Sequence, residues 1–159
     1  MASLIVCDSG PLISLARIQR LDLISQTLDA IHIPQGVYQE VVGQSQGRPG
    51  TELQNQTWVT VHPDPNTIPI EVSNLGRGEA TAIGLALQLR ADLLLIDDRQ
   101  ARTIAERLNL PCAGTLHLLQ RAKQKGVIPL VRPILDALIL AEFRISKATR
   151  QAFLLSQNE

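Results

Sequence analysis

The chain has 159 residues, a formal net charge of zero, and hydrophobic residues at 45% of its positions. The length suits a single domain, and the neutral charge gives no overall basic signal for nucleic acid. Two cysteines are too few for a disulfide framework, no N-terminal signal peptide is recognisable, and no apolar run is long enough for a transmembrane helix. We therefore expect a cytoplasmic protein without a membrane partner, in which Cys7 and Cys112 are buried, reduced thiols.

Charge is distributed unevenly along the chain. Residues 1–98 carry 5 basic and 11 acidic side chains, a net charge of −6, whereas residues 99–159 carry 10 basic and 4 acidic ones, a net charge of +6. An acidic site beside a basic second half would suit a polyanion bound through metal ions. Ordinary variation in surface charge would give the same imbalance.

Strand and helix patterns alternate in the first half of the chain. The apolar stretch over residues 3–7 predicts a strand, and Gly10 and Pro11 suit a sharp turn into a helix that Ser9 could cap. In chain order the sequence then predicts a helix over 21–28, a strand over 30–33, a helix from Pro34, a loop over 43–50, a helical turn over 52–56, a strand over 58–61 and a connector over 62–74.

The second half continues this alternation. It predicts a deeply packed helix from residue 76, a strand from 93, a helix over 99–108, a weak strand over 110–113, and helices over 116–124, 130–142 and 146–156. Alternating strands and helices are typical of an α/β fold with a parallel sheet covered on both faces. We expect one domain over 1–159, in which residues 127–159 form a C-terminal helical extension that could serve as a lid or a partner surface.

Two adjacent carboxylates, Asp97 and Asp98, directly follow the apolar run LLLI at 93–96. Such a run is typical of a strand buried on both faces, and ligands of parallel sheets bind beyond the carboxyl ends of the strands. Asp8 follows the first predicted strand in the same way. The simpler alternative is that one of the paired aspartates caps the next helix, a position that Asp favours.

Two glutamates extend this acidic set: Glu79 at the start of the helix from residue 76, and Glu40 on the helix from Pro34. Alone, Glu79 could complement the helix dipole, Glu40 could be a solvated surface residue, and Asp8 could be a turn former. Together, three of these acidic positions are predicted at one edge of one sheet. A cation relieves the repulsion between clustered carboxylates, and oxygen ligands favour Mg²⁺ or Mn²⁺, which suits phosphodiester hydrolysis.

Other catalytic signatures are missing from the sequence. It contains no glycine-rich loop of the P-loop or dinucleotide-binding kind. Its three histidines, His32, His62 and His117, are scattered and give no Ser–His–Asp arrangement, so we expect each of them to be structural.

Four segments, taken in order, resemble the PIN domain, and more closely a prokaryotic branch related to the VapC-type toxins. They are VCDSGPLISL at 6–15, IPxxVYxEV at 33–41, RGEAxAI at 77–83 and IDDRxAR at 96–102. The resemblance covers nearly the whole chain. It implies a three-layer α/β/α sandwich around a central parallel sheet, and an Mg²⁺- or Mn²⁺-dependent ribonuclease.

The resemblance also implies roles for the acidic residues. Asp8 matches the family's first aspartate, a direct metal ligand, and Asp98 matches its last, with Asp97 beside it as a further candidate. Glu79 stands where many members carry an aspartate, and its longer side chain could shift the ion or require a second one. Glu40 matches a glutamate that usually acts through metal-bound water. The predicted catalytic set is therefore all five acids, with Asp8, Glu79 and Asp98 as metal ligands.

Substrate and partner predictions follow from the same resemblance. Ser9 matches the small hydroxyl residue that often follows the first aspartate. Arg99 and Arg102 could contact substrate phosphates, or could pair with the acids when no metal is bound. We expect a single-stranded or looped RNA substrate, a homodimer formed by the apolar faces around 135–140, and a protein antitoxin as the partner of a toxin.

Two other functions stay open. A non-catalytic PIN-like module that binds protein or RNA would keep the fold and some of the acids, and the neutral net charge is compatible with it. Metal binding would separate this module from a nuclease. A phosphoacceptor receiver-like domain would carry paired acids after its first strand and a lysine after its last, and this sequence has neither.

Overall fold

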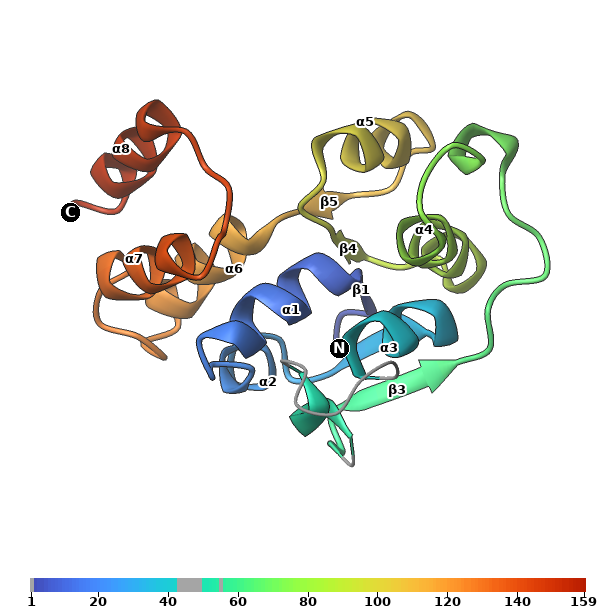
Figure 1. Cartoon of the computed structure of the whole chain (residues 1–159), viewed down its shortest axis with the longest axis horizontal. Helices are drawn as coiled ribbons and strands as arrows, with labels where there is room; N and C mark the ends of the chain where they lie inside the picture. The colour runs from blue at the N-terminus through green and yellow to red at the C-terminus, as the bar shows by residue number, and fades with distance from the viewer. Residues whose placement is uncertain (1, 43–49, 55) are drawn as a thin grey trace.

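The computed structural model describes residues 2–42, 50–54 and 56–159, in which strands and helices alternate along the chain (Figure 1). The strands are β1 (Ile5–Cys7), β2 (Ile31–Pro34), β3 (Val59–His62), β4 (Leu93–Leu95) and β5 (Cys112–Ala113). The helices are α1 (Ser9–Arg17), α2 (Asp22–Leu28), α3 (Gln35–Val42), α4 (Arg77–Leu89), α5 (Arg99–Arg107), α6 (Thr115–Gln124), α7 (Arg132–Leu140) and α8 (Lys147–Ser156). Two short 3₁₀ helices, η1 (Thr51–Leu53) and η2 (Ile70–Val72), lie in the connections.

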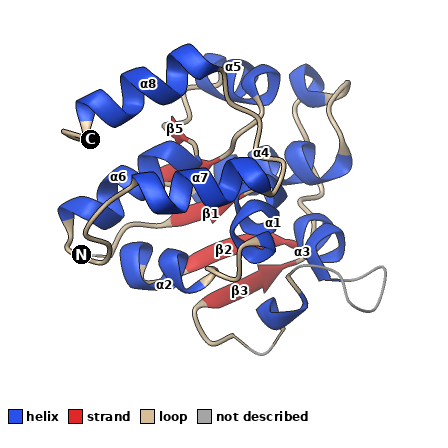
Figure 2. Cartoon of the chain, turned by 60° about the vertical axis from the view of Figure 1, so that its left-hand side comes forward, coloured by secondary structure: helices blue, strands red, loops and turns tan. Residues whose placement is uncertain are grey.

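The five strands form one parallel sheet in the order β3-β2-β1-β4-β5, with helices on both of its faces (Figure 2). This is the predicted three-layer α/β/α sandwich. The chain builds outward from β1 to β2 and β3, then returns to the other side of β1 to add β4 and β5. The strand order therefore reverses between β1 and β4. Ligands of open α/β sheets bind at this kind of reversal, beyond the carboxyl ends of the strands.

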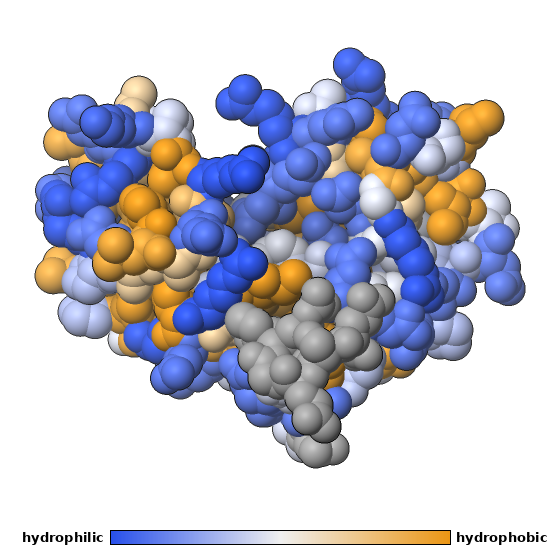
Figure 3. All heavy atoms as spheres, in the orientation of Figure 1, coloured by the Kyte–Doolittle hydropathy of each residue, from blue (hydrophilic) through white to orange (hydrophobic). Residues whose placement is uncertain are grey.

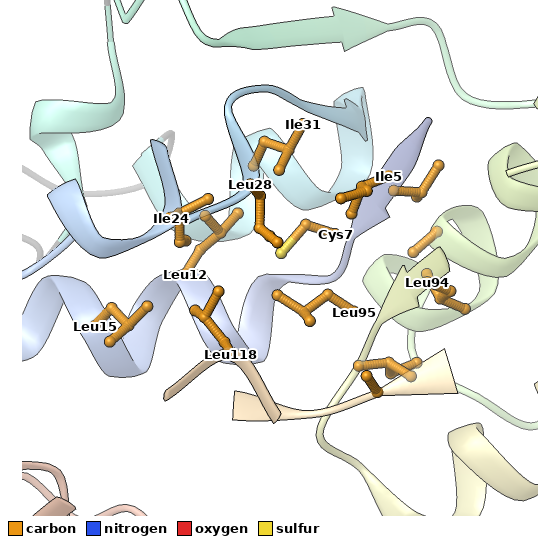
Figure 4. Close-up of a cluster of buried hydrophobic side chains, with 14 of the residues drawn as sticks. Ile5, Cys7, Leu12, Leu15, Ile24, Leu28, Ile31, Leu94, Leu95 and Leu118 are labelled. Atoms are coloured by element: carbon orange, nitrogen blue, oxygen red, sulfur yellow. The ribbon is translucent and has the colours of Figure 1, made fainter. Parts of the chain in front are cut away.

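The two central strands are buried on both faces, which is why their sequences are apolar throughout and do not alternate. Every residue of β1 is at most 1% exposed, as are Leu94 and Leu95 of β4. Leu12 of α1 and Leu118 of α6 belong to the same buried cluster (Figure 4). At the edge of the sheet, β3 is more accessible, with Val61 39% exposed. The core thus holds β1 and β4 rigidly at the centre of the sheet.

The C-terminal helices are fastened to α6 through Glu159. Its side chain is only 5% exposed and accepts hydrogen bonds from Lys123 Nζ at 2.7 Å and from the amides of Val131 and Arg132 at 2.8 and 2.9 Å. Burial by itself would raise the pKa of Glu159, but these hydrogen bonds outweigh it and lower the pKa to about 2. Helices α7 and α8 are therefore tied to the sandwich by a charged, buried contact.

Most predicted elements are confirmed, with a few differences. Asp8, not Ser9, occupies the N-cap position of α1. The connector over 62–74 contains the turn η2, and the helix expected over 130–142 is confined to 132–140. Cys112 is half-buried, not buried as predicted, because β5 is an edge strand of two residues.

Some predicted features fall outside the described residues. These are positions 43–49 of the loop expected over 43–50, and Asn55 of the turn expected over 52–56. Within the ranges that the structure describes, no helix is both long and apolar enough to cross a lipid bilayer.

Candidate active site

Acidic residues gather where the strand order reverses. Asp8 directly follows β1, and Asp97 and Asp98 follow β4, the parallel neighbour of β1. The amide of Asp8 donates a hydrogen bond to the carbonyl of Leu95 at 2.8 Å, so the pairing of the two strands continues to the first acid. Glu79, in the first turn of α4, lies at the same edge of the sheet and close enough for its charge to act on Asp8. The predicted acids of the strand ends therefore lie together, as parallel strands require.

Asp8 is the most deeply buried of these acids. Its side chain belongs to a residue that is 3% exposed, and its Oδ1 atom has no hydrogen-bond partner in the part of the chain that the structure describes. Burial raises the pKa of Asp8 to about 7; the charges of Glu79, Glu40 and Asp97 contribute to the rise, and a hydrogen bond from the Ser9 amide opposes it. A buried polar atom without a partner is costly and points to a missing ligand.

Glu40 reaches the site from α3 and joins three segments. Its Oε2 accepts a hydrogen bond from Ser9 Oγ at 2.6 Å, and its Oε1 accepts one from the amide of Gly78 at 2.9 Å. Glu40 is therefore a partly buried residue close to Asp8 and not a solvated surface residue, and its role in a reaction stays a prediction. Ser9, which was predicted as a substrate contact, positions this glutamate beside Asp8.

Glu79 caps its helix and also lies close enough to the other acids to interact with their charges. As a capping residue, it accepts a hydrogen bond from the Gly76 amide at 3.3 Å, which helps to hold the first turn of α4. It is also electrostatically coupled to the other acids. Burial raises the pKa of Glu79, and the charges of Asp98 and Glu40 raise it further, against the hydrogen bond from Gly76.

The two adjacent aspartates have different environments. Asp98 is exposed at the N-cap of α5, where its Oδ1 accepts a hydrogen bond from the Ala101 amide at 2.8 Å. The capping role considered for this pair is therefore real and belongs to Asp98. Asp97 instead turns toward α6: its two oxygens accept hydrogen bonds from the amide of Thr115 at 2.7 Å and from the Thr115 hydroxyl at 2.6 Å.

Close packing of Gly114 permits this arrangement of Asp97. A Cβ atom added at Gly114 would lie 2.8 Å from Asp97 Oδ1 and 2.6 Å from a guanidinium nitrogen of Arg102. Arg102 donates hydrogen bonds to the main-chain carbonyls of Ile96 and Asp97, at 3.1 to 3.3 Å, and to no acidic side chain among the described residues. The predicted pairing of Arg102 with the acids is therefore not observed. Its guanidinium holds the end of β4 in place.

The predicted arginines thus separate into two kinds. Arg102 is half-buried and donates its hydrogen bonds to main-chain carbonyls, whereas Arg99 is exposed at the first position of α5. The carbonyl of Arg99 accepts a hydrogen bond from the Thr103 hydroxyl at 3.0 Å, but its guanidinium makes no hydrogen bond or ion pair with any residue described by the structure. Only Arg99 of the two is available to a ligand as the structure stands.

Sequence reasoning missed three residues that shape the site: Gly78, Gly114 and Thr115. Gly114 is the N-cap of α6 and Thr115 its first residue, just as Asp8 is the N-cap of α1 and Ser9 its first residue. The same order of a strand, an N-cap residue and a hydroxyl residue at the first helical position was therefore visible in the sequence.

Two of the histidines form a pair away from the acids. His32 Nδ1 lies 2.9 Å from His62 Nε2, across the β2–β3 pairing, and burial together with the charge of His62 lowers the pKa of His32. This contact links the edge strand to its neighbour, in agreement with a structural role. His117 is exposed on α6.

The acids fit a divalent cation in their chemistry and in one structural feature. Their oxygens are hard ligands of the kind that Mg²⁺ and Mn²⁺ prefer, and Oδ1 of Asp8 is buried without a partner. Among the described residues, however, no three potential ligand side chains are close enough to hold a metal as they stand. Burial, and after it the charges of neighbouring acids, raise the pKa values of Asp8 and Glu79, and a bound cation would favour their ionised forms.

Comparison with protein families gives one match. The model of a family described as a PIN domain matches residues 4–159, which is nearly the whole chain. A search of curated proteins finds no match.

Proposed function

The chain belongs to the PIN-domain family, and on this premise we propose that it is a metal-dependent endoribonuclease. PIN domains are typically nucleases that use divalent metal ions. The acids at the strand-order reversal are the part of this chain that would carry such a reaction. RNA as the substrate, cleavage within the strand, and Mg²⁺ or Mn²⁺ as the ion are parts of the proposal.

The observation that carries this proposal is the state of Asp8. Its unpartnered, buried Oδ1 and its pKa of about 7 describe a carboxylate that is poorly compensated by the protein alone. A protein built only for stability would place a hydrogen-bond donor or an apolar side chain there. A bound cation would complete the coordination of Asp8 and favour its ionised form.

In the proposed site, Asp8, Glu79 and Asp98 would hold the ion, and the chemistry that it would supply is Lewis-acid stabilisation of charge on the phosphate and a lower pKa of bound water. Glu40 orients the attacking water from its place between Ser9 and Gly78. Asp97 acts as a positioning residue, because its bonds to Thr115 fix the start of α6 against the end of β4.

The test is cleavage of labelled RNA by the purified chain with Mn²⁺ or Mg²⁺, beside an EDTA control and the variant Asp98→Asn. Asn caps helices as well as Asp does, so this variant should keep α5 intact while removing the ligand charge. Asp29→Asn is the matched control, since Asp29 is exposed just before β2, at the opposite edge of the sheet. Metal-dependent cleavage that is lost only in Asp98→Asn supports the proposal. Cleavage that survives this substitution refutes the assigned site.

We further propose that the protein is the toxin of a toxin–antitoxin pair and forms a homodimer. The resemblance of the four sequence segments supports the toxin role. Exposed Leu140 and Leu155 border a groove of about 990 Å³ between α7 and α8, and this apolar surface supports self-association. Growth arrest by the wild-type chain but not by Asp98→Asn would support the toxin role, and a monomeric mass that Leu140→Glu leaves unchanged would refute this dimer.

A second candidate is a non-catalytic binding module. Carboxylate oxygens of Glu40, Asp97 and Asp98 already accept hydrogen bonds from other residues of the chain. These contacts favour a role for the acids in holding the structure together and not in catalysis. A calorimetric titration with Mn²⁺ separates the candidates. A module would show no binding that depends on Asp8 and Asp98, whereas the proposed nuclease would lose binding in either asparagine variant.

A further inference from the structure

A second feature lies next to the acids: a cleft between the N-terminal ends of α5 and α6 and the segment that joins α7 to α8. Its volume is about 620 Å³, and Asp97 and Thr115 lie in its wall. Figure 3 shows the molecule hollowed between the lobe of α8 and the lobe of α5, with hydrophilic side chains around the hollow. The cleft therefore connects the candidate active site with the C-terminal helices.

Two unpaired cations line this cleft. Arg99 and Arg144 are both exposed, and neither guanidinium makes a hydrogen bond or ion pair with a residue in the described ranges. Other arginines of the same region are occupied: Arg102 by main-chain carbonyls, Arg150 by Asp136 at 2.6 Å, and Arg132 by the carbonyl of Glu159 at 2.7 Å. Arg99 and Arg144 are thus available to an anion from opposite sides, one on α5 and one before α8.

Aromatic side chains line the same cleft. The chain contains two phenylalanines, and both of them, Phe143 before α8 and Phe153 on α8, lie in its wall. Each is partly buried and packs against the core, so each ring keeps a restricted position while part of it stays accessible. Aromatic faces next to unpaired arginines are the combination that binds single-stranded nucleic acid, through base stacking and phosphate contacts.

We propose that this cleft binds a nucleotide of single-stranded RNA adjacent to the cleaved phosphate, with its base against Phe143 or Phe153 and its phosphate between Arg99 and Arg144. The inference rests on the proposed function and extends it, because it makes the C-terminal helices part of the substrate site. A paired base could not reach the rings, so the cleft selects an unstacked strand. The volume lies within the range of about 300–1,000 Å³ that is typical of small-ligand sites.

The arginines are tested by binding of a fluorescent single-stranded RNA oligonucleotide in EDTA, where affinity is measured separately from cleavage. Arg99→Gln and Arg144→Gln should each weaken binding and lower the slope of log K against log salt by about 0.7, the value for one phosphate contact on a single strand. Arg107→Gln is the matched control, because Arg107 is exposed on the same helix as Arg99 but lies outside the cleft. Equal slopes in all three variants would overturn the proposal.

The rings are tested by Phe143→Leu and Phe153→Leu, which keep an apolar side chain against the core. At least one of them should weaken binding about fivefold or more. Replacing one nucleotide of the probe by an abasic residue should weaken wild-type binding to a similar extent and should cause no further loss in that variant. Circular dichroism of each variant establishes that it is folded. Full sensitivity to the abasic residue in both leucine variants would refute stacking at this site.

The outcomes for the cleft and for the nuclease are distinguishable. RNA binding that depends on the arginines and rings, without any cleavage, would support the cleft and contradict the nuclease. Metal-dependent cleavage that is the same in all cleft variants would support the nuclease and overturn the cleft.

Discussion

The amide of Gly78 donates a hydrogen bond to Oε1 of Glu40 at 2.9 Å, across the contact between α3 and α4. The absence of a side chain at Gly78 makes this approach possible, since a Cβ atom there would fall 2.6 Å from the carboxyl carbon of Glu40. The same glutamate also accepts a hydrogen bond from the hydroxyl of Ser9, the residue next to Asp8. The first turn of α4 therefore holds Glu40 in the site and has a role beyond carrying Glu79.

The first prediction follows from this contact. Gly78→Ala should displace the Glu40 carboxylate and lower RNA cleavage to the level of Glu40→Gln. The free energy of unfolding should change by no more than about 1 kcal/mol, because Ala favours the helix while Glu40 can swing away. In the double variant the two losses should not add, as is typical of residues in contact. Gly76→Ala, where a Cβ has room, is the control. Additive losses in the double variant would contradict this coupling.

Asp8→Asn should stabilise the protein at alkaline pH in the absence of metal. The pKa of Asp8 is about 7 in the folded chain and near 4 when unfolded, so its ionisation costs native stability as the pH rises between these values. The variant should therefore unfold with a free energy higher by on the order of 2–4 kcal/mol above pH 7, and the difference should vanish below pH 4. Urea denaturation in EDTA at pH 4, 5.5 and 8 measures it, and an equal difference at all three values would contradict the buried charge.

Mn²⁺ should stabilise the wild-type chain against heat, and more strongly at pH 8 than at pH 5.5. Binding requires ionised Asp8, which is largely protonated below its pKa of about 7. Asp98→Asn should remove the stabilisation by Mn²⁺ without lowering the melting temperature of the metal-free chain, whereas Asp29→Asn should keep it. A thermal shift of equal size at both pH values would argue against Asp8 as a ligand.

Thr115→Val should lower stability and activity together. The substitution removes the hydroxyl that donates to Asp97 at 2.6 Å and leaves a half-buried carboxylate oxygen without its partner. We expect a loss of about 1–3 kcal/mol in the free energy of unfolding. Thr115→Ser, which keeps the donor, should recover most of it. If valine and serine had the same effect in urea denaturation, the packing of the methyl group and not the hydrogen bond would be responsible.

Glu159→Gln should loosen the C-terminal helices at neutral pH. The charged hydrogen bonds of Glu159 lower its pKa to about 2 in the folded chain, so the stability they contribute is present above about pH 4.5 and is lost as the pH falls toward 2. We expect the variant to be less stable by at least about 1 kcal/mol at pH 7 and equal to the wild type near pH 2. Amide hydrogen exchange of α7 and α8 locates the effect. Loosening confined to other elements would contradict this role.

The positions of Asp8, Asp97, Asp98 and Glu79 could be predicted from the sequence, because these acids follow a strongly patterned strand or lie in the first turn of a strongly patterned helix. Asp8 and Asp97 follow continuous apolar runs, which indicate central strands of a parallel sheet, and strands of this kind end at one edge. Glu79 lies in the first turn of the helix that follows the connector predicted over 62–74. The pattern of these elements is local, so it could be recognised without knowledge of the tertiary structure.

The partners of the acids could not be predicted, because they come from distant segments. Thr115 lies 18 residues from Asp97, and Gly78 lies 38 residues from Glu40. No local pattern distinguishes these residues from other turn formers. The cleft could not be predicted from the sequence either, because it forms only when the segment before α8 folds back beside the start of α5.

The pairing of β1 with β4 limits which insertions, deletions and substitutions this sequence can accept. Asp8 continues the pairing of β1 with β4 through its hydrogen bond to Leu95, two residues before Asp97. Inserting or deleting one residue in either strand would reverse the facing of every side chain beyond it, and would expose core leucines as it displaced an acid. The spacing of the acids therefore cannot drift independently of the hydrophobic core, and substitutions that adjust activity are confined to the helices and turns around them.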